Sequence, residues 1–520
     1  MSIQISNPYS IRLGVLGAGT MGSGIALTAL LSNMLVMLYD VSPQMLEQAR
    51  SYIDKHLARK GQASGLKNLV LTQSLEDLTG AGVVVEAVPE DLALKQKLFA
   101  RLDLICSPPA ILATNTSTLP VTAIAAATST PERVAGMHFF NPAPVLPLVE
   151  VIRGAQTNPD TIQTLVKLAQ LIGKTPVVAR DTPGFIVNRV ARPFYGEALR
   201  LLGEGTATHS EIDLVVRLGG GFRMGPFQLM DLIGIDVNFA AMQSMYEQTF
   251  GEPRYRPHLI QAQMVQQKAL GRKSGRGFYR YDPDHPTADP DLPRQSKHSG
   301  QVMISRGYWG PGTAETCRKA GYTFTNDAAN HPIIGIVIAG KSDGLKKQVL
   351  EMDRSLPADV PLLCQCADIT LTELAAWVSH PERLVGFDGL FFASGSIASL
   401  VSSPTLTPQA RAAVESFVTS TGRLQAWIQD SPALILPRIV SMLANEAAFA
   451  LGEGVAELKT IDKAMQLGVN YPKGPLTWAK EIGYPTIVET LDHLHAEYGE
   501  ERYRVAPLLR RWARLSNVTD

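Results

Sequence analysis

The stretch Ile11-Arg-Leu-Gly-Val-Leu-Gly17-Ala-Gly19-Thr20-Met21-Gly22 decides the fold of the first part of the chain. A short apolar run leads into three glycines spaced GxGxxG, and a helical pattern of apolar residues follows. Glycines in that setting allow a tight turn, a close approach of the backbone to a pyrophosphate, and close packing of helix against strand. The stretch therefore predicts a strand, a dinucleotide-binding turn, and a helix whose N-terminus faces phosphate groups. The expected cofactor contacts in this turn are Gly17, Gly19, Thr20, Met21 and Gly22.

A second apolar run, Leu35 to Tyr39, ends at Asp40. A carboxylate at the end of this strand can accept hydrogen bonds from both hydroxyls of the adenosine ribose. It would repel the extra phosphate of NADP as a like charge, and no arginine follows at once to compensate. The sequence therefore favours NAD as the cofactor.

The pattern beyond Asp40 indicates an α/β domain followed by an α domain. A third apolar run, Val83 to Val88, precedes a helical pattern that begins near Leu92. Alternating strands and helices predict a parallel sheet that is covered on both faces. From Gly184 to about Leu270 the pattern is helical. We expect a Rossmann-type NAD-binding domain at 1–182, a helical domain at 183–280, and a polar, proline-rich linker at 281–298.

The chain also repeats itself. Residues 183–234 match residues 432–483 at a constant offset of 249, which pairs Arg189 with Arg438. An offset of 250 pairs 131–133 with 381–383. The run Gly307-Tyr-Trp-Gly-Pro-Gly does not reproduce the phosphate-binding turn. We therefore expect a reduced Rossmann-like domain without a cofactor site at 299–430 and a second helical domain at 431–520.

Composition narrows the function classes. Hydrophobic residues make up 45% of the chain and charged residues 18%, which fits a globular protein and argues against extended disorder. Lys plus Arg balances Asp plus Glu at 48 each, so no net charge favours nucleic acid or an anionic membrane. The four cysteines form no CxxC pair, and no apolar stretch reaches the length of a membrane span. We expect a cytoplasmic protein with free thiols, no leader peptide and no metal.

Two residues indicate acid–base chemistry. His138 follows an apolar strand candidate, and Glu150 lies inside Leu148-Val-Glu-Val-Ile. Oxidation of an alcohol needs a base for the hydroxyl proton, and imidazole titrates near the operating pH. A carboxylate on the other ring nitrogen would orient the imidazole, and a Glu inside an apolar strand needs such a partner. From spacing alone, a structurally satisfied histidine remains the alternative.

Taken together, the motifs resemble the 3-hydroxyacyl-CoA dehydrogenase family. The resemblance rests on the glycine turn with Asp40, and on Asn115-Thr-Ser117, His138-Phe-Phe-Asn-Pro, Leu148-Val-Glu-Val-Ile and Asp181-Thr-Pro-Gly-Phe-Ile-Val-Asn188-Arg. It covers residues 11 to about 280. It implies reversible, NAD-dependent oxidation of a (3S)-3-hydroxyacyl-CoA to the 3-oxoacyl-CoA, as in fatty-acid β-oxidation.

The resemblance also implies residue roles. His138 would be the general base and Glu150 its orienting partner, while Ser117 and Asn188 would bind the reacting oxygen of the substrate or position the imidazole. Arg59, Lys60 and Lys67 could meet the CoA phosphates, but they are equally consistent with surface charges, as are Lys95 and Lys273. Further expected cofactor contacts are Asp40, Glu90, Lys95, Asn115, Ser117, Asn141 and Lys273.

The second copy lacks the matching residues. Alignment of the halves places Ala367 opposite Ser117, Asp388 opposite His138 and Pro437 opposite Asn188. We expect Asp388 to be largely ionised at neutral pH and to have a structural role. The tandem helical domains are expected to pack against each other within one chain, and a homodimer of the chain is compatible with that packing.

Two alternatives stay open at this point. The first is an NAD dehydrogenase on the same scaffold that acts on a small free hydroxy acid, because the segment between Asp40 and Val70 is short for a CoA-binding region. The second is a non-catalytic acyl-CoA-binding protein. The sequence does not choose between 3-hydroxybutyryl-CoA and 3-hydroxyadipyl-CoA as substrates.

Overall fold

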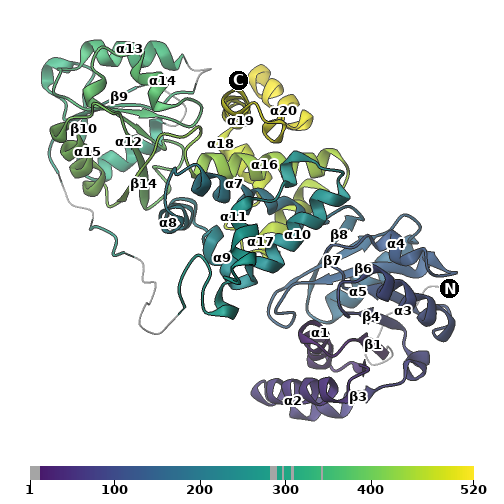
Figure 1. Cartoon of the computed structure of the whole chain (residues 1–520). Coiled ribbons are helices and arrows are strands. Elements are labelled where there is room, and N and C mark those ends of the chain that lie inside the picture. The colour runs from purple at the N-terminus through teal and green to yellow at the C-terminus, as the bar shows by residue number, and fades with distance from the viewer. Residues whose placement is uncertain (1–11, 282–289, 295–297, 306–309, 341–343, 520) are drawn as a thin grey trace. The chain divides into compact units, whose positions relative to one another are not determined.

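The computed structural model describes residues 12–281, 290–294, 298–305, 310–340 and 344–519 (Figure 1). These residues form two compact units. The first unit is Met1–Val190 with Ala450–Asn470, and the second is Ala191–Phe449 with Tyr471–Asp520. Each unit therefore combines segments from both copies of the repeat. Most of the predicted linker, and residues 307–309 of the second glycine-rich run, lie outside the described residues.

The first unit contains an eight-stranded sheet in the order β3-β2-β1-β4-β5-β6-β7-β8. All neighbours are parallel except β6 and β7, which are antiparallel. The third predicted strand ends two residues earlier than expected, at Glu86. The strands are β1 (Arg12–Leu16), β2 (Leu35–Tyr39), β3 (Leu69–Thr72), β4 (Val83–Glu86), β5 (Ile111–Thr114), β6 (Val134–Phe139), β7 (Leu148–Arg153) and β8 (Thr175–Arg180).

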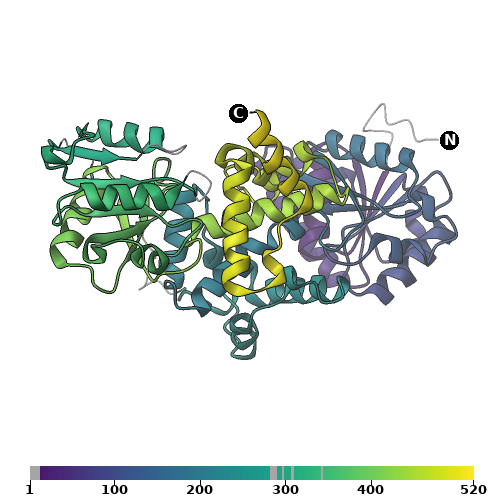
Figure 2. The ribbon, with the colours of Figure 1, turned by 90° about the horizontal axis from the view of Figure 1, so that it is seen from above.

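Helices cover both faces of this sheet (Figure 2). Alternate side chains of a strand point to opposite faces, so Val15 and Leu16 enter different hydrophobic cores. One core joins the sheet to the first, second and fifth helices, and the other joins it to the third and fourth. These helices are α1 (Thr20–Leu31), α2 (Pro43–Arg59), α3 (Leu92–Ile105), α4 (Val121–Ala125) and α5 (Pro159–Leu171).

Local sequence determines where several of these helices begin. The Ser42 hydroxyl accepts a hydrogen bond from the Met45 backbone N–H at the start of α2. The Asp91 carboxylate does the same for the Leu94 N–H at the start of α3. Such caps satisfy N–H groups that lack partners within the helix. The glycine turn before α1 has no side-chain cap, which leaves its first N–H groups open to a ligand.

The second unit contains a seven-stranded sheet in the order β10-β9-β11-β12-β13-β14-β15. It again has a single antiparallel pair, β13 with β14. Among its described residues it has one strand fewer than the first sheet, because it lacks a counterpart of the edge strand β3. Its elements are β9 (Gln301–Ile304), α12 (Gly310–Lys319), β10 (Thr323–Phe324), β11 (Ile334–Val337), α13 (Leu345–Ser355), β12 (Leu362–Gln365), α14 (Leu371–Ala375), β13 (Leu384–Phe387), β14 (Ile397–Ser402), α15 (Pro408–Ser420) and β15 (Leu424–Ile428).

The remaining long elements are helical, as the sequence predicts. Residues of the first helical region form α6 (Val187–Val190), α7 (Arg192–Gly203), α8 (His209–Gly220), α9 (Pro226–Ile233), α10 (Ile235–Gln248) and α11 (Leu259–Gln266). Residues of the second form α16 (Leu436–Gly452), α17 (Leu458–Gly468), α18 (Pro475–Ile482), α19 (Tyr484–Tyr498) and α20 (Pro507–Thr519). None of the described helices is long and apolar enough to cross a membrane.

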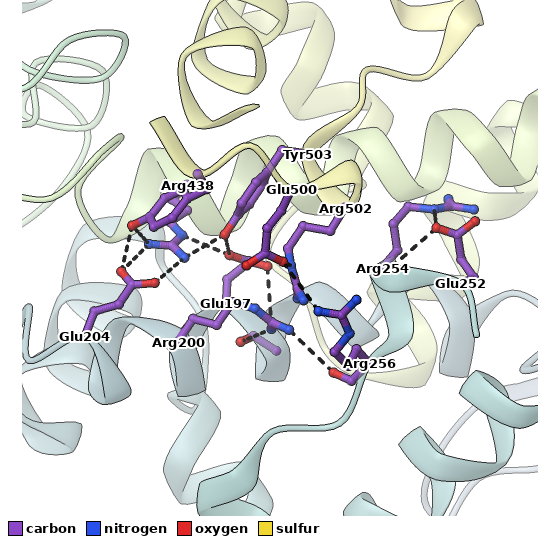
Figure 3. Close-up of polar contacts among 12 residues, drawn as sticks. Glu197, Arg200, Glu204, Glu252, Arg254, Arg256, Arg438, Glu500, Arg502 and Tyr503 are labelled. Atoms are coloured by element: carbon purple, nitrogen blue, oxygen red, sulfur yellow. Dashed lines mark hydrogen bonds and ion pairs between the residues drawn. The ribbon is translucent and has the colours of Figure 1, made fainter. Parts of the chain in front are cut away.

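Buried ion pairs join the two helical regions inside the second unit (Figure 3). The guanidinium of Arg438 is fully buried and donates to Glu197 at 2.9 Å and to Glu204 at 2.8 Å. It also donates to the Tyr503 hydroxyl at 2.7 Å. A buried charge with this many partners is satisfied, whereas removal of one partner would leave a costly unpaired charge. These contacts show helices of the two copies packing within one chain.

Candidate active site

The glycine turn has the shape that a dinucleotide needs. Gly17 has φ +93°, and a Cβ there would lie 2.7 Å from the Ala87 carbonyl oxygen. A Cβ on Gly22 would lie only 1.7 Å from the Gly17 carbonyl oxygen, so the helix packs tightly on the turn. A Cβ on Gly19 would meet no atom within 4 Å. The middle glycine therefore faces open space, where a phosphate can approach the backbone.

Asp40 lies beside this turn at the carboxyl end of β2. Its Oδ2 accepts a hydrogen bond from the Ala18 N–H at 2.7 Å, and its Oδ1 accepts one from the Ser42 N–H at 2.9 Å. These bonds fix the carboxylate at the edge of the glycine turn. From this position a carboxylate can accept hydrogen bonds from the hydroxyls of the adenosine ribose.

The His138–Glu150 pair forms across the antiparallel strands. His138 in β6 and Glu150 in β7 are direct cross-strand partners, and Nδ1 of His138 lies 2.8 Å from Oε2 of Glu150. Both side chains are buried. The other carboxylate oxygen of Glu150 accepts the N–H groups of Ile186 and Val187 at 3.1 and 3.0 Å. Because the carboxylate occupies Nδ1, Nε2 is the ring nitrogen left for proton transfer.

Three more predicted residues come together near these strands. Asn188 lies in α6, directly after Val187, and its side-chain amide donates to the Ser117 carbonyl oxygen at 3.3 Å. The Asn115 side chain accepts the Phe139 N–H at 2.8 Å, which ties the end of β5 to the end of β6. Asn141 follows β6 and is exposed. The structure thus groups Asn115, Ser117, His138 and Asn188 at the carboxyl ends of adjacent strands.

A chain of ionic contacts, buried at Glu86 and Lys95, supports the Ser117 turn. The Lys95 ammonium lies 2.7 Å from Glu86 and 3.2 Å from Glu90. The Glu90 carboxylate in turn accepts the backbone N–H groups of Ser117 and Thr118 at 2.9 and 3.0 Å. Burial alone would raise the pKa of Glu90, but Lys95 and these hydrogen bonds lower it below its usual value. Lys95 is therefore a buried cation and not a surface charge, and its role and that of Glu90 as cofactor contacts stay predictions.

Sequence reasoning missed Glu86, the fully buried carboxylate in this chain of contacts. Its Oε1 accepts Lys95 and the Val88 N–H, and its Oε2 accepts the Thr114 hydroxyl at 2.7 Å. The available signal was a glutamate at the end of the otherwise apolar run Val83-Val-Val-Glu86. Such a residue needs a buried partner, for the same reason that singled out Glu150.

The comparisons with known proteins identify the family of the chain. The 3-hydroxyacyl-CoA dehydrogenase NAD-binding domain matches residues 12–182. The C-terminal domain of the same family matches residues 184–281 and again 434–519. The chain belongs to the 3-hydroxyacyl-CoA dehydrogenase family. Its Rossmann-type fold, repeated helical region, NAD cofactor and activity as an NAD-dependent oxidoreductase acting on CH–OH are thereby confirmed.

Relatives of two lengths are found. The 3-hydroxyadipyl-CoA dehydrogenase of Escherichia coli K12 is 38% identical over 514 residues, which cover 97% of this chain and 98% of that protein. A probable 3-hydroxybutyryl-CoA dehydrogenase of Bacillus subtilis is 44% identical over 280 residues, 52% of this chain and 97% of that protein. The crystal structure of an E. coli K12 3-hydroxybutyryl-CoA dehydrogenase superposes with a TM-score of 0.83 at 35% identity, covering 98% of this chain and 100% of that one.

The structure does not group three other predicted contacts with the residues of this site. Arg59 and Lys60 are exposed at the end of α2, a helix of 17 residues. Because that helix starts just after Asp40, its far end lies ~25 Å along its axis from the cofactor turn. Lys273 belongs to the second unit, where its ammonium lies 2.5 Å from Asp236. The roles of these residues in binding CoA or the cofactor stay predictions.

In the second unit, the positions matched to the active site hold different chemistry. Asp388 follows β13, and its carboxylate accepts the N–H groups of Leu390 and Phe391 at 3.1 and 3.2 Å. Burial raises the pKa of Asp388 to about 7. At neutral pH the carboxyl group is thus about half ionised and not largely ionised as expected, because sequence does not show how deeply the strand end is buried. Ser399 stands at the position of Glu150 and accepts the Asp388 N–H through its carbonyl oxygen at 3.2 Å.

Proposed function

We propose that His138 is the general base in the oxidation of a (3S)-3-hydroxyacyl-CoA to the 3-oxoacyl-CoA. The observation that carries this proposal is the buried 2.8 Å contact between His138 Nδ1 and Glu150. This contact turns Nε2 into the proton acceptor and gives the imidazolium a counter-charge when the proton arrives. Glu150 is itself held by two backbone N–H groups, so the imidazole is oriented before substrate binds.

The other site residues serve the same step. NAD, when bound, accepts the hydride from C3 of the substrate, and the protein positions the reactants for that transfer. Ser117 and Asn188 are linked by a hydrogen bond and would bind the substrate oxygen as its proton leaves. Glu90 and Lys95 hold the Ser117 turn. The open space at Gly19 and the carboxylate of Asp40 fit the pyrophosphate and the ribose.

The proposal extends to substrate and setting. The relative that covers the whole chain is named for 3-hydroxyadipyl-CoA, whereas shorter relatives are named for 3-hydroxybutyryl-CoA. Both CoA esters are therefore candidate substrates. The described cysteines are all free and buried, which fits a cytoplasmic, reducing setting. Helices of both copies pack within one chain, so formation of a homodimer is a separate question.

The test compares turnover of three substrates: (3S)-3-hydroxybutyryl-CoA, 3-hydroxyadipyl-CoA and the free hydroxy acid gulonate. NADH formation should be fast with at least one CoA ester and negligible with gulonate. His138→Gln should lower kcat by about 10²–10⁴-fold and leave NAD binding nearly unchanged, because only the base is lost. Asp388→Asn, at the matching position of the second copy, should leave kcat unchanged.

Each alternative predicts a different result. Faster oxidation of gulonate than of either ester would favour a free hydroxy acid as substrate. Binding of acyl-CoA without any turnover would favour a non-catalytic protein. If Asp388→Asn lowered kcat as strongly as His138→Gln while the protein still melted normally, the second copy would be catalytic.

A further inference from the structure

A helix from the second copy packs against the active-site elements of the first. Helix α17 belongs to the first unit and ends at Gly468. A Cβ on Gly468 would lie 2.8 Å from Cδ2 of Leu148 and 3.0 Å from Cγ2 of Val187. Leu148 is the first residue of β7, and Val187 is the first residue of α6. The glycine therefore touches the strand that carries Glu150 and the helix whose first N–H group binds the Glu150 carboxylate.

Hydrogen bonds and an ion pair extend this contact. The Arg180 backbone N–H donates to the Val455 carbonyl oxygen at 2.9 Å, so the segment from the second copy is bonded to the end of β8. The buried guanidinium of Arg189 lies 2.7 Å from a carboxylate oxygen of Glu453. Arg189 is the residue after Asn188 in α6. Residues 450–470 thus hold α6 through its side chains as well as through packing.

The contacted residues are close to the reacting groups in the chain. The N–H of Val187 is one of the two that hold Glu150, at 3.0 Å. The next residue, Asn188, donates to the Ser117 carbonyl oxygen. A shift of α6 would therefore move three groups of the site together: the support of Glu150, the amide of Asn188 and the Ser117 turn.

The second unit contains the same arrangement with the copies exchanged. A Cβ on Gly219, at the end of α8, would lie 3.1 Å from Leu436 and 3.5 Å from Ile397. These residues match Gly468, Val187 and Leu148 at the offset of 249. The Gln429 N–H donates to the Thr206 carbonyl oxygen at 2.9 Å, which repeats the bond from Arg180 to Val455. The same packing thus occurs in both units, but in the second unit it supports a sheet that lacks the counterpart of the His138–Glu150 pair.

We propose that residues 450–470 of the second copy act as a positioning element for the active site of the first, with Gly468 as the positioning residue. The proposal rests on the proposed function, because it concerns the placement of Glu150 and Asn188. It gives the second copy, which lacks the His–Glu pair, a role in the reaction. The role is to hold β7 and α6 at the separation that lets the Val187 N–H bind Glu150.

Substitution of Gly468 in the full-length chain tests the proposal. Alanine raises intrinsic helix propensity, so any loss of activity in Gly468→Ala cannot come from a weaker α17. The added Cβ must displace Leu148 or Val187, and valine must displace them further. A misplacement of catalytic groups by about 1 Å can cost ~10²-fold in rate. We therefore expect kcat to fall modestly in the alanine variant and about 10–100-fold in the valine variant.

Two further readouts separate positioning from loss of folded protein. The KM for NAD should stay within about 2-fold, because the glycine turn lies on other strands of the sheet. The primary kinetic isotope effect with substrate deuterated at C3 should rise, because hydride transfer becomes slower relative to binding and release. The matched variants Gly219→Ala and Gly219→Val should lower the melting temperature in a similar way but leave kcat and the isotope effect unchanged.

The outcomes are distinguishable. An inactive wild-type protein would refute the proposed function and not the packing argument. Wild-type kcat in Gly468→Val would overturn the positioning role, as would a loss of kcat that only follows the melting temperature with no change in isotope effect. If the valine variant does not fold, the alanine variant decides by the same criteria.

Discussion

At the residue scale, Glu86 shows how a group that touches no reacting atom can set the geometry of the site. It is fully buried at the end of β4 and binds Lys95, which also contacts Glu90. Glu90 then accepts the N–H groups of Ser117 and Thr118. The position of the Ser117 turn therefore depends on a charge three contacts away. An unpaired ammonium in this place would be costly, which ties stability and geometry together.

Glu86→Gln tests this dependence. The substitution removes the nearer and more deeply buried of the two carboxylates beside Lys95 and should lower the free energy of unfolding by roughly 3 kcal/mol, as for other broken buried pairs. It should also lower kcat by about 10-fold, because the Ser117 turn loosens. Asp103→Asn is the matched control, since Asp103 and Arg133 form another buried pair, at 2.7 Å, on the same domain. The control should lose stability and keep its kcat; equal kcat in both variants would contradict the relay.

At the element scale, the two sheets keep the same local devices although their chemistry differs. The Asp181 carboxylate accepts the N–H groups of Val121 and Thr122 at the start of α4. Asp430 does the same for Leu371 and Thr372 at the start of α14. Capping by a distant carboxylate has survived duplication because it stabilises a helix in either copy. The histidine at the end of β6 has no such structural need, and aspartate replaces it in the second copy.

Much of the first sheet was predictable, because strand, glycine turn and helix follow one another in the sequence. The His138–Glu150 pair was predictable for a similar reason: a glutamate inside an apolar strand needs a partner. The burial of Lys95 was not predictable, since a lysine at a helix start is typical of a solvated surface. The contact of Gly468 with Val187 was also beyond sequence reasoning, because it depends on how distant segments pack. Local patterns thus identify elements, whereas tertiary contacts decide which residues support them.

The end of β13 gives a prediction for pH dependence. Burial raises the pKa of Asp388 from 3.8 to about 7 on folding. Because the pKa of Asp388 is higher in the folded state, the protonated carboxyl group contributes to the stability of the protein. This contribution is complete below about pH 4 and is lost as the pH rises through 7. Asp388→Asn removes this titration but keeps an oxygen that can accept the Leu390 and Phe391 N–H groups.

The variant should therefore gain stability relative to wild type as the pH rises from 5 to 8, by the order of 2 kcal/mol. Melting temperatures of both proteins measured across this range check the prediction. Parallel curves would show that the carboxyl group does not titrate there. If the melting temperature of the wild type rose relative to that of the variant with rising pH, the N–H groups around Asp388 would stabilise its ionised form by more than burial destabilises it.

At the scale of the whole molecule, duplication has produced one chain in which each sheet is packed by helices of the other copy. Gly468 packs on the first sheet and Gly219 on the second. The buried Arg438 network joins helices of the two copies inside the second unit (Figure 3). Such a chain has two related sheets, but among the described residues only the first sheet holds a buried His–Glu pair across its antiparallel strands. Its catalytic capacity should be that of a single site.

The number of cofactor sites follows from the two sheets. In the first sheet, the glycine turn depends on Gly17, because its φ of +93° is rarely adopted by other residues and a Cβ there would lie 2.7 Å from the Ala87 carbonyl oxygen. The sequence between 299 and 430 contains no intact GxGxxG turn. Because a pyrophosphate needs backbone N–H groups that a Cβ does not shield, the second sheet should not bind NAD in the same way. Titration calorimetry should give one NAD per chain.

The variant Gly17→Val tests whether the first glycine turn is the single NAD site. Its side chain would collide with the Ala87 carbonyl oxygen, 2.7 Å from the new Cβ, in a backbone conformation that valine rarely adopts. If the first turn is the single site, the variant should lose all NAD binding while the second unit still melts as in wild type. Residual binding of one NAD per chain would refute the count. It would direct attention to the cavity of about 520 Å³ in the second unit, where Ser305 and Asn326 follow β9 and β10 and Lys347 offers a positive charge from α13.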